Sequence, residues 1–200
     1  MNIAIVKYNA GNTQSVIYAL NRLGIEPIVS DEAEVLQRAD KVIFPGVGEA
    51  STAMNYLRAR GLDTIIKNLQ QPVLGICVGL QLLCRYSEEN NTECMGIFDV
   101  AVRRFQPSEE QKATVKVPQI GWNNLFDMHS PLFAGISEQD AYVYFVHSYY
   151  AELSPYTIAK SNYCLDFSAA LHKDNFYAVQ FHTEKSGAVG AKILDNFLRL

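Results

Sequence analysis

The residues Gly75-Ile76-Cys77-Val78-Gly79 match the pattern of a nucleophile elbow, a tight turn between a strand and a helix, with cysteine in the nucleophile position. Glycines must flank the nucleophile because side chains there would collide with neighbouring backbone. The helix that follows directs its positive N-terminal end at the sulfur and so favours the thiolate. The N–H of Val78 is placed to stabilise an oxyanion. The pattern predicts nucleophilic catalysis by Cys77.

A second interpretation of Cys77 is a buried, inert cysteine at the end of a strand, which is common for free cysteines. The two interpretations differ in what else the chain must supply. A cysteine nucleophile needs a histidine to take its proton and a third group to hold that histidine.

His182 and Glu184 are the candidates for these two roles. His182 follows the apolar run Tyr177-Ala178-Val179-Gln180-Phe181, and Glu184 lies two residues further on. In an extended chain residues i and i+2 point the same way, so the carboxylate could fix the imidazole tautomer. Taken alone, this pair is also typical of a solvated strand end. Together with the elbow, it indicates a Cys77–His182–Glu184 triad.

The other histidines are weaker candidates for the base. His147 closes the run Tyr142–Val146 but has no acidic residue nearby until Glu152, so we interpret it as a structural or pocket-wall residue. His129 and His172 are next to polar loop residues and are expected to be exposed.

The first half of the chain alternates apolar runs with amphipathic segments, which predicts a mainly parallel sheet covered on both faces. The expected strands are 3–6, 27–29, 41–44 and 72–77. The expected helices are 12–23, 31–37 with Ser30 as N-cap, 49–60, and a segment that starts near Leu80.

The second half reads as strands with few helices between them: 100–105, 141–147, 156–160, 169–173 and 176–182. A final amphipathic helix is expected over 189–200. We therefore predict a single α/β domain over residues 1–200, a three-layer sandwich whose mainly parallel central sheet has an antiparallel extension.

Composition excludes several classes of function. The net charge of −4 gives no surface suited to nucleic-acid phosphates or anionic lipid, and no apolar run is long enough to cross a membrane. The N-terminus lacks a secretory signal, so we expect a cytoplasmic protein whose four cysteines are reduced thiols. With no Cys-x-x-Cys pair and only scattered histidines, we expect no metal site.

The segments 75–81 and 180–184 together resemble the class I (triad) glutamine amidotransferases. Four further motifs resemble one branch of that family, the glutaminase subunits of imidazole glycerol phosphate synthase. These motifs are Gly11-Asn12, Pro45-Gly46-Val47-Gly48, Pro118-Gln119-Ile120-Gly121-Trp122-Asn123, and Lys185-Ser186-Gly187. The resemblance runs from the first strand to the last helix.

This resemblance implies a role for each of several residues. Cys77 would attack the carboxamide of glutamine, His182 would protonate the departing ammonia, and Glu184 would orient His182, with a glutamyl thioester as intermediate. The second oxyanion N–H would come from Gly46, Val47 and Gly48, where a peptide unit can flip. The substrate would be bound by Gln81, Glu89, Val146, Ser148 and Tyr149. The residues facing a partner would be Asn12, Trp122, Tyr144 and Lys185.

The same resemblance implies no cofactor and a heterodimer with a (β/α)8-barrel cyclase subunit, whose hollow axis would carry ammonia to a second active site in histidine biosynthesis. Core packing is the alternative interpretation of Trp122 and Tyr144, and an exposed surface position that of Lys185. Two other functions stay open: a glutaminase for pyridoxal phosphate, anthranilate or guanylate synthesis, and a non-catalytic elbow-cysteine protein.

One position departs from the family pattern. The family usually has proline between the triad histidine and glutamate, and this chain has Thr183. Proline pre-sets the backbone, so threonine is expected to loosen the orientation of Glu184 slightly without abolishing the triad.

Overall fold

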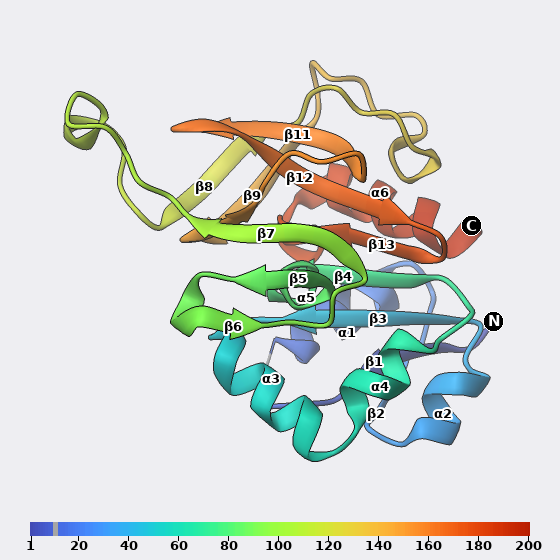
Figure 1. Ribbon diagram of the computed structural model, residues 1–200. Helices are drawn as coiled ribbons and strands as arrows, with labels where there is room; N and C mark the ends of the chain where they lie inside the picture. Colours follow the sequence, from blue (N-terminus) through green and yellow to red (C-terminus); the bar gives the residue numbers. More distant parts are fainter. Residues whose placement is uncertain (10–11) are drawn as a thin grey trace.

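A computed structural model describes residues 1–9 and 12–200 of the chain. Gly11 of the Gly11-Asn12 motif lies outside the described residues. Within them, one mixed sheet of eleven strands runs through the molecule, and a two-stranded sheet lies beside it (Figure 1).

The parallel part of the large sheet is built from the apolar runs of the first half and one late strand. In spatial order its strands are β2 (Ile28–Ser30), β1 (Ile3–Val6), β3 (Lys41–Gly46), β4 (Val73–Cys77) and β13 (Phe176–Val179). Because helices cover both faces, these strands need no polar alternation, and β1, β3 and β4 are buried at every position. Gly46 pairs with Cys77 in the register, which brings the ends of β3 and β4 together.

The antiparallel extension begins where β13 pairs with β12 (Leu165–Lys173). It continues through β10 (Tyr149–Ala151), β7 (Phe98–Arg104), β5 (Cys84–Ser87) and β6 (Thr92–Glu93), and β11 (Thr157–Tyr163) also pairs with β12. Only the β5–β7 pair in this part is parallel. The separate sheet is the antiparallel pair of β8 (Gln119–Asn124) and β9 (Tyr142–His147).

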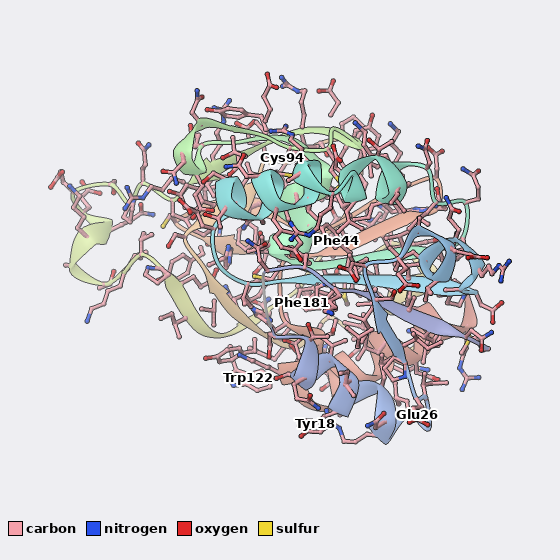
Figure 2. All side chains as sticks on the ribbon, turned by 90° about the horizontal axis from the view of Figure 1, so that it is seen from below. Tyr18, Glu26, Phe44, Cys94, Trp122 and Phe181 are labelled. Atoms are coloured by element: carbon pink, nitrogen blue, oxygen red, sulfur yellow. The ribbon has the colours of Figure 1, made fainter. Side chains whose placement is uncertain are left out.

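The helices form the two outer layers. They are α1 (Thr13–Arg22), α2 (Ala33–Arg38), α3 (Ala50–Ala59), α4 (Leu62–Lys67), α5 (Val78–Leu83) and α6 (Gly187–Arg199). Short 3-10 turns lie at η1 (Glu89–Asn91), η2 (Gln111–Ala113), η3 (Pro131–Phe133) and η4 (Thr183–Lys185). Seen from below, α3 and α4 lie on one face of the parallel strands and α1 on the other (Figure 2). The predicted three-layer α/β class is confirmed.

The core fills the space between these layers and extends under the antiparallel part. Phe44, Phe145 and Phe181 are fully buried in it, on β3, on β9 and just after β13 respectively. Phe145 and Phe181 pack edge to face, with ring centroids 5.9 Å apart. Among the described residues, no helix is both long enough and apolar enough to span a membrane.

Several expected details are wrong. Helix α2 begins at Ala33, and its N-cap is Glu32; the Ser30 hydroxyl instead accepts a hydrogen bond from the Glu32 N–H at 3.0 Å, which forms a turn before the helix. The last strand ends at Val179 and does not reach His182. His172 is half-buried because its ring stacks on Tyr177 at 4.0 Å.

Candidate active site

Cys77 lies on a strained turn between β4 and α5. Its φ of 54° and ψ of −109° place a residue with a side chain in a region that favours glycine. A Cβ at Gly79 would lie 2.0 Å from the Phe44 carbonyl oxygen, and one at Gly75 would lie 2.7 Å from a Leu83 methyl carbon. The glycines are therefore required for α5 to pack against β3 and β4, which holds the sulfur at the sheet edge.

His182 and Glu184 meet through a helical turn. Glu184 lies in η4, so the expectation of an extended His182–Glu184 segment is wrong. The turn nevertheless brings His182 Nδ1 to 2.7 Å from Glu184 Oε1, and both side chains are almost completely buried. Because a carboxylate can only accept, Nδ1 carries a proton and Nε2 is the ring nitrogen left for the nucleophile.

Burial alone would lower the pKa of His182, but its hydrogen bonds with Cys77 and Glu184 outweigh burial and raise the pKa to about 10. His182 is therefore held as an imidazolium when the Cys77 sulfur is charged. When the sulfur attacks a carbon atom, His182 can give this proton to the group that leaves that carbon.

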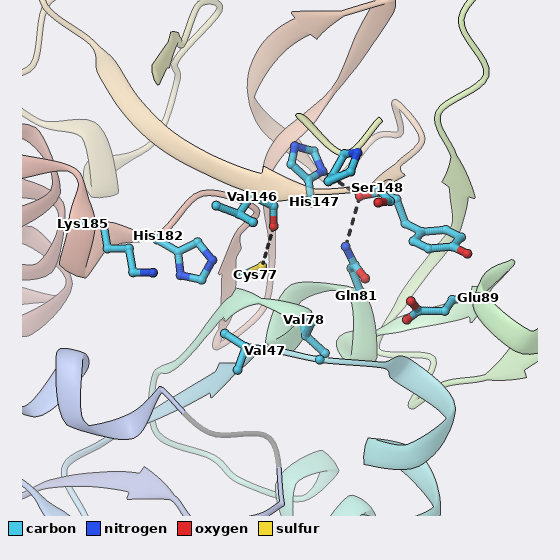
Figure 3. Close-up of a pocket in the computed structure, with 13 residues that line it drawn as sticks. Val47, Cys77, Val78, Gln81, Glu89, Val146, His147, Ser148, His182 and Lys185 are labelled. Carbon is cyan, nitrogen blue, oxygen red and sulfur yellow. Dashed lines mark hydrogen bonds between the residues drawn. The ribbon is translucent and has the colours of Figure 1, made fainter. Parts of the chain in front are cut away.

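Cys77 and His182 line a cavity of about 300 Å³ (Figure 3). Of the residues predicted to form the oxyanion hole, Val47, Gly48 and Val78 line it. Gly46 is buried at the end of β3 behind them. The predicted substrate residues all line the cavity: Gln81, Glu89, Val146, Ser148 and Tyr149.

Two polar side chains, Gln81 and Glu89, line this cavity on the side of Cys77 away from His182 (Figure 3). The Gln81 amide nitrogen donates to the Tyr149 carbonyl at 3.1 Å (Figure 3). Glu89 accepts from the Ala50 N–H at 2.7 Å. Burial raises the pKa of Glu89, although the Ala50 N–H opposes this effect. An amide oxygen and a carboxylate are groups suited to an ammonium ion.

His147 lines the same cavity as a neutral wall residue. Its Nδ1 donates to the Tyr149 carbonyl at 2.7 Å. Nε2 of the neutral ring lies 2.9 Å from the Gln119 side-chain amide and accepts from it, which requires the NH₂ group of Gln119 to face the ring. Burial lowers its pKa to about 4, against the opposing effect of the Tyr149 carbonyl. With no carboxylate partner, this ring holds the pocket wall in place.

The other thiols are poor nucleophiles. Burial raises the pKa of Cys84, Cys94 and Cys164 alike, which keeps each of them protonated near neutral pH. In the described residues no cysteine is in a disulfide, and no group of three or more His, Cys, Asp or Glu side chains is arranged to hold a metal.

The residues expected at a partner interface do not form one uniform patch. Trp122 is 57% exposed on β8, and its ring contacts half-buried Tyr144 edge-on, with centroids 6.0 Å apart. Lys185 is exposed at the cavity mouth. Asn12, in contrast, points inward and donates to Glu184 Oε1 at 2.8 Å. Its contact with the triad carboxylate was not expected from the sequence.

No role was assigned to Gln180 or Pro118 from the sequence, although both lie in motifs that carry the family resemblance. Pro118 lines the cavity, and the side chain of Gln180 is completely buried against Cys77. A polar residue inside the otherwise apolar run 177–181 is the signal that could have drawn attention to Gln180, because buried amides need partners.

The fold and this site define a class of enzyme. The sequence profile described as Glutamine amidotransferase class-I matches residues 4–200, so the chain belongs to the class I glutamine amidotransferase family and is an enzyme that hydrolyses glutamine. It is 58% identical to the imidazole glycerol phosphate synthase subunit HisH of Bacteroides thetaiotaomicron and 47% identical to that of Escherichia coli K12, with 100% of each chain covered in both cases.

Solved structures agree on the fold. A glutamine amidotransferase superposes with a TM-score of 0.73 at 19% identity, covering 98% of this chain and 97% of the other. A second one, from Thermotoga maritima, has a TM-score of 0.61 at 14% identity, covering 100% and 83%. At this identity the likeness concerns the fold alone.

Proposed function

We propose that this chain is the glutaminase subunit of an imidazole glycerol phosphate synthase and that Cys77, His182 and Glu184 are its catalytic triad. The observation that carries the triad is the 2.7 Å bond from His182 Nδ1 to Glu184 Oε1, next to a cysteine held at positive φ. The branch of the family is supported by the relatives named as HisH, which match over their whole length.

The reaction proceeds through a thioester. The Cys77 thiolate attacks the side-chain carboxamide carbon of glutamine, and the oxyanion is stabilised by the Val78 N–H and by a second N–H from Gly46, Val47 or Gly48. His182 gives its Nε2 proton to the amide nitrogen as the carbon–nitrogen bond breaks, and ammonia leaves. Water then attacks the thioester carbon, His182 takes up its proton, and glutamate leaves as the sulfur regains its charge.

The substrate is held at its other end. Gln81 and Glu89 bind the charged α-amino end and backbone groups of Val146, Ser148 and Tyr149 complete the pocket. The volume of about 300 Å³ suits a single small amino acid.

The partner is a (β/α)8-barrel cyclase that covers the cavity mouth and receives ammonia before it is captured as ammonium in water. The side chains of Trp122, Ile120 and Tyr142 are exposed on the β8–β9 sheet. They support an interface on this sheet, because large apolar groups exposed together mark protein interfaces. Tyr144 contacts Trp122, Lys185 is exposed at the cavity mouth, and we place Asn12 at the edge of the interface. A cytoplasmic location is part of this proposal.

Glutamine hydrolysis with and without the cyclase subunit and its nucleotide ligand tests the proposal. We expect a low rate for the chain alone, a large increase on adding both, and no activity from Cys77→Ala in any mixture. If the imidazole-forming cyclase gives no increase but another synthase does, the chain serves that other pathway. A Cys77→Ser variant that keeps the full rate of glutamine hydrolysis would show that Cys77 is not the nucleophile.

A further inference from the structure

The buried side chain of Gln180 connects the nucleophile to the substrate-binding side of the pocket. It lies just after β13, and its exposed fraction is 0%. Its amide nitrogen is 3.7 Å from the Cys77 sulfur, and its amide oxygen is 3.1 Å from the Gln81 amide nitrogen. Both polar atoms of this buried amide have partners, so displacing the side chain would cost free energy, because these atoms would lose their hydrogen bonds.

The orientation of both amides follows from one backbone group. The Tyr149 carbonyl can only accept, so Gln81 must present its NH₂ group there, at 3.1 Å. The same NH₂ group faces Gln180, which must therefore present its oxygen. The Gln180 NH₂ group is left facing the sulfur. The order of donors and acceptors from Tyr149 to Cys77 is thus fixed.

This order has a consequence at each end. The Gln81 oxygen makes no hydrogen bond with the described residues and stays available to a ligand in the cavity. At the other end, the sulfur has two polar neighbours besides His182: the Val146 carbonyl at 3.9 Å, which can accept only from a thiol, and the Gln180 N–H, which stabilises a thiolate.

We propose that Gln180 is a positioning residue that holds Gln81 in the orientation needed to bind glutamine and donates a hydrogen bond to the Cys77 thiolate. The inference rests on the proposed glutaminase function. The two roles use different atoms of one side chain, so they can be separated by substitution.

Gln180→Glu keeps an acceptor for Gln81 but loses the donor to sulfur, and Gln180→Leu loses both. Asn196→Asp is the matched control, because Asn196 is a buried amide bonded to the Leu132 and Ala134 carbonyls outside the site. The first measurement is the rate of Cys77 alkylation by iodoacetamide in the folded chain, followed on the Cys77 peptide by mass spectrometry. The second is kcat and KM for glutamine in the complex with cyclase.

We expect alkylation to slow about tenfold in both Gln180 variants, because one hydrogen bond to a charged sulfur is lost. In Gln180→Glu, kcat falls about tenfold with KM within about threefold of wild type, whereas in Gln180→Leu, KM also rises about tenfold. Asn196→Asp keeps wild-type values for all three quantities. Wild-type alkylation in both Gln180 variants, or equal changes of kcat and KM in both, would overturn the proposal.

The alkylation measurement needs neither glutamine nor cyclase. A wild-type chain that fails to hydrolyse glutamine therefore contradicts the proposed function, while the alkylation rates still decide the donor role of Gln180. If Gln180→Glu does not fold, the neutral Gln180→Leu variant decides: slowed alkylation supports the donor role and an unchanged rate contradicts it.

Discussion

His182 and His147 both line the same pocket and both are buried. Their surroundings nevertheless shift their pKa values in opposite directions. His182 follows β13 and faces the Glu184 carboxylate and the Cys77 sulfur, which raise its pKa. His147 ends β9 and faces a carbonyl and an amide, and burial lowers its pKa. The comparison shows that burial alone does not make a base; an anionic partner decides whether a buried imidazole can carry a proton in catalysis.

The largest expected difference is in activity. His182→Asn should lower kcat for glutamine by at least about 10³-fold, because it removes the group that moves the proton. His147→Gln keeps a donor for the Tyr149 carbonyl and should lose less than about tenfold. Steady-state assays of both variants with cyclase measure the two losses, and comparable losses would contradict the separation of roles.

Without the charge of Glu184, the surroundings of His182 should resemble those of His147 more closely. Glu184→Gln keeps the size of the side chain but loses the anion, and kcat should fall roughly 10²-fold, less than for His182→Asn. Asn12 also donates to Glu184 Oε1, so Asn12→Ala in the same assay gives the smaller effect of losing a neutral donor. Full activity in Glu184→Gln would show that the Glu184 carboxylate does not take part in catalysis.

The neutral state of His147 should be detectable as a loss of folding stability in acid. Its folded pKa of about 4 lies below the unfolded value of 6.5, so between these values the unfolded chain binds a proton that the folded chain does not. Stability is therefore lost as pH falls through this window, by roughly 3 kcal/mol at most.

Urea unfolding at several pH values between 7 and 4 measures this loss. Wild type should lose more stability than His147→Gln, which lacks the titrating ring. His129→Gln is the control, because His129 is exposed, and it should follow wild type. Parallel curves for wild type and His147→Gln would mean that His147 is not held neutral.

The smallest effect is expected at Thr183, the first residue of η4. The preceding residue has φ −87° and ψ 100°, a conformation compatible with a following proline, and the Thr183 hydroxyl is buried without a partner in the described structure. Thr183→Pro should therefore stabilise the fold by about 0.4–1 kcal/mol, measured by thermal unfolding. A lower melting temperature would show that the threonine fits this turn better than proline does.

Much of this arrangement is predictable from residue patterns. The runs Ile3–Val6 and Val73–Cys77 are apolar throughout, as expected of strands buried on both faces, and the glycines around Cys77 indicate the elbow. The antiparallel strands are harder to predict from the sequence than the parallel ones. For example, β6 and β10 are two and three residues long, too short for an alternating pattern to be recognised.

The finer features of the site depend on tertiary contacts. Glu184 reaches His182 through a 3-10 turn that the local sequence did not indicate, and Asn12 reaches Glu184 from 172 residues away in the chain. Gln180 resembles an ordinary member of an apolar strand until its neighbours are known. Residue types thus locate the nucleophile, while the partners of each buried polar group become visible only in the folded chain.

The central claim is that glutamine is cleaved through a thioester on Cys77, and trapping that intermediate tests it most directly. The chain with its cyclase is mixed with radiolabelled glutamine, quenched in acid during turnover and digested. Label should be found on the peptide that contains Cys77 and should be released by hydroxylamine. Continued glutamate production with no label on that peptide, or by a Cys77→Ala variant, would contradict the account.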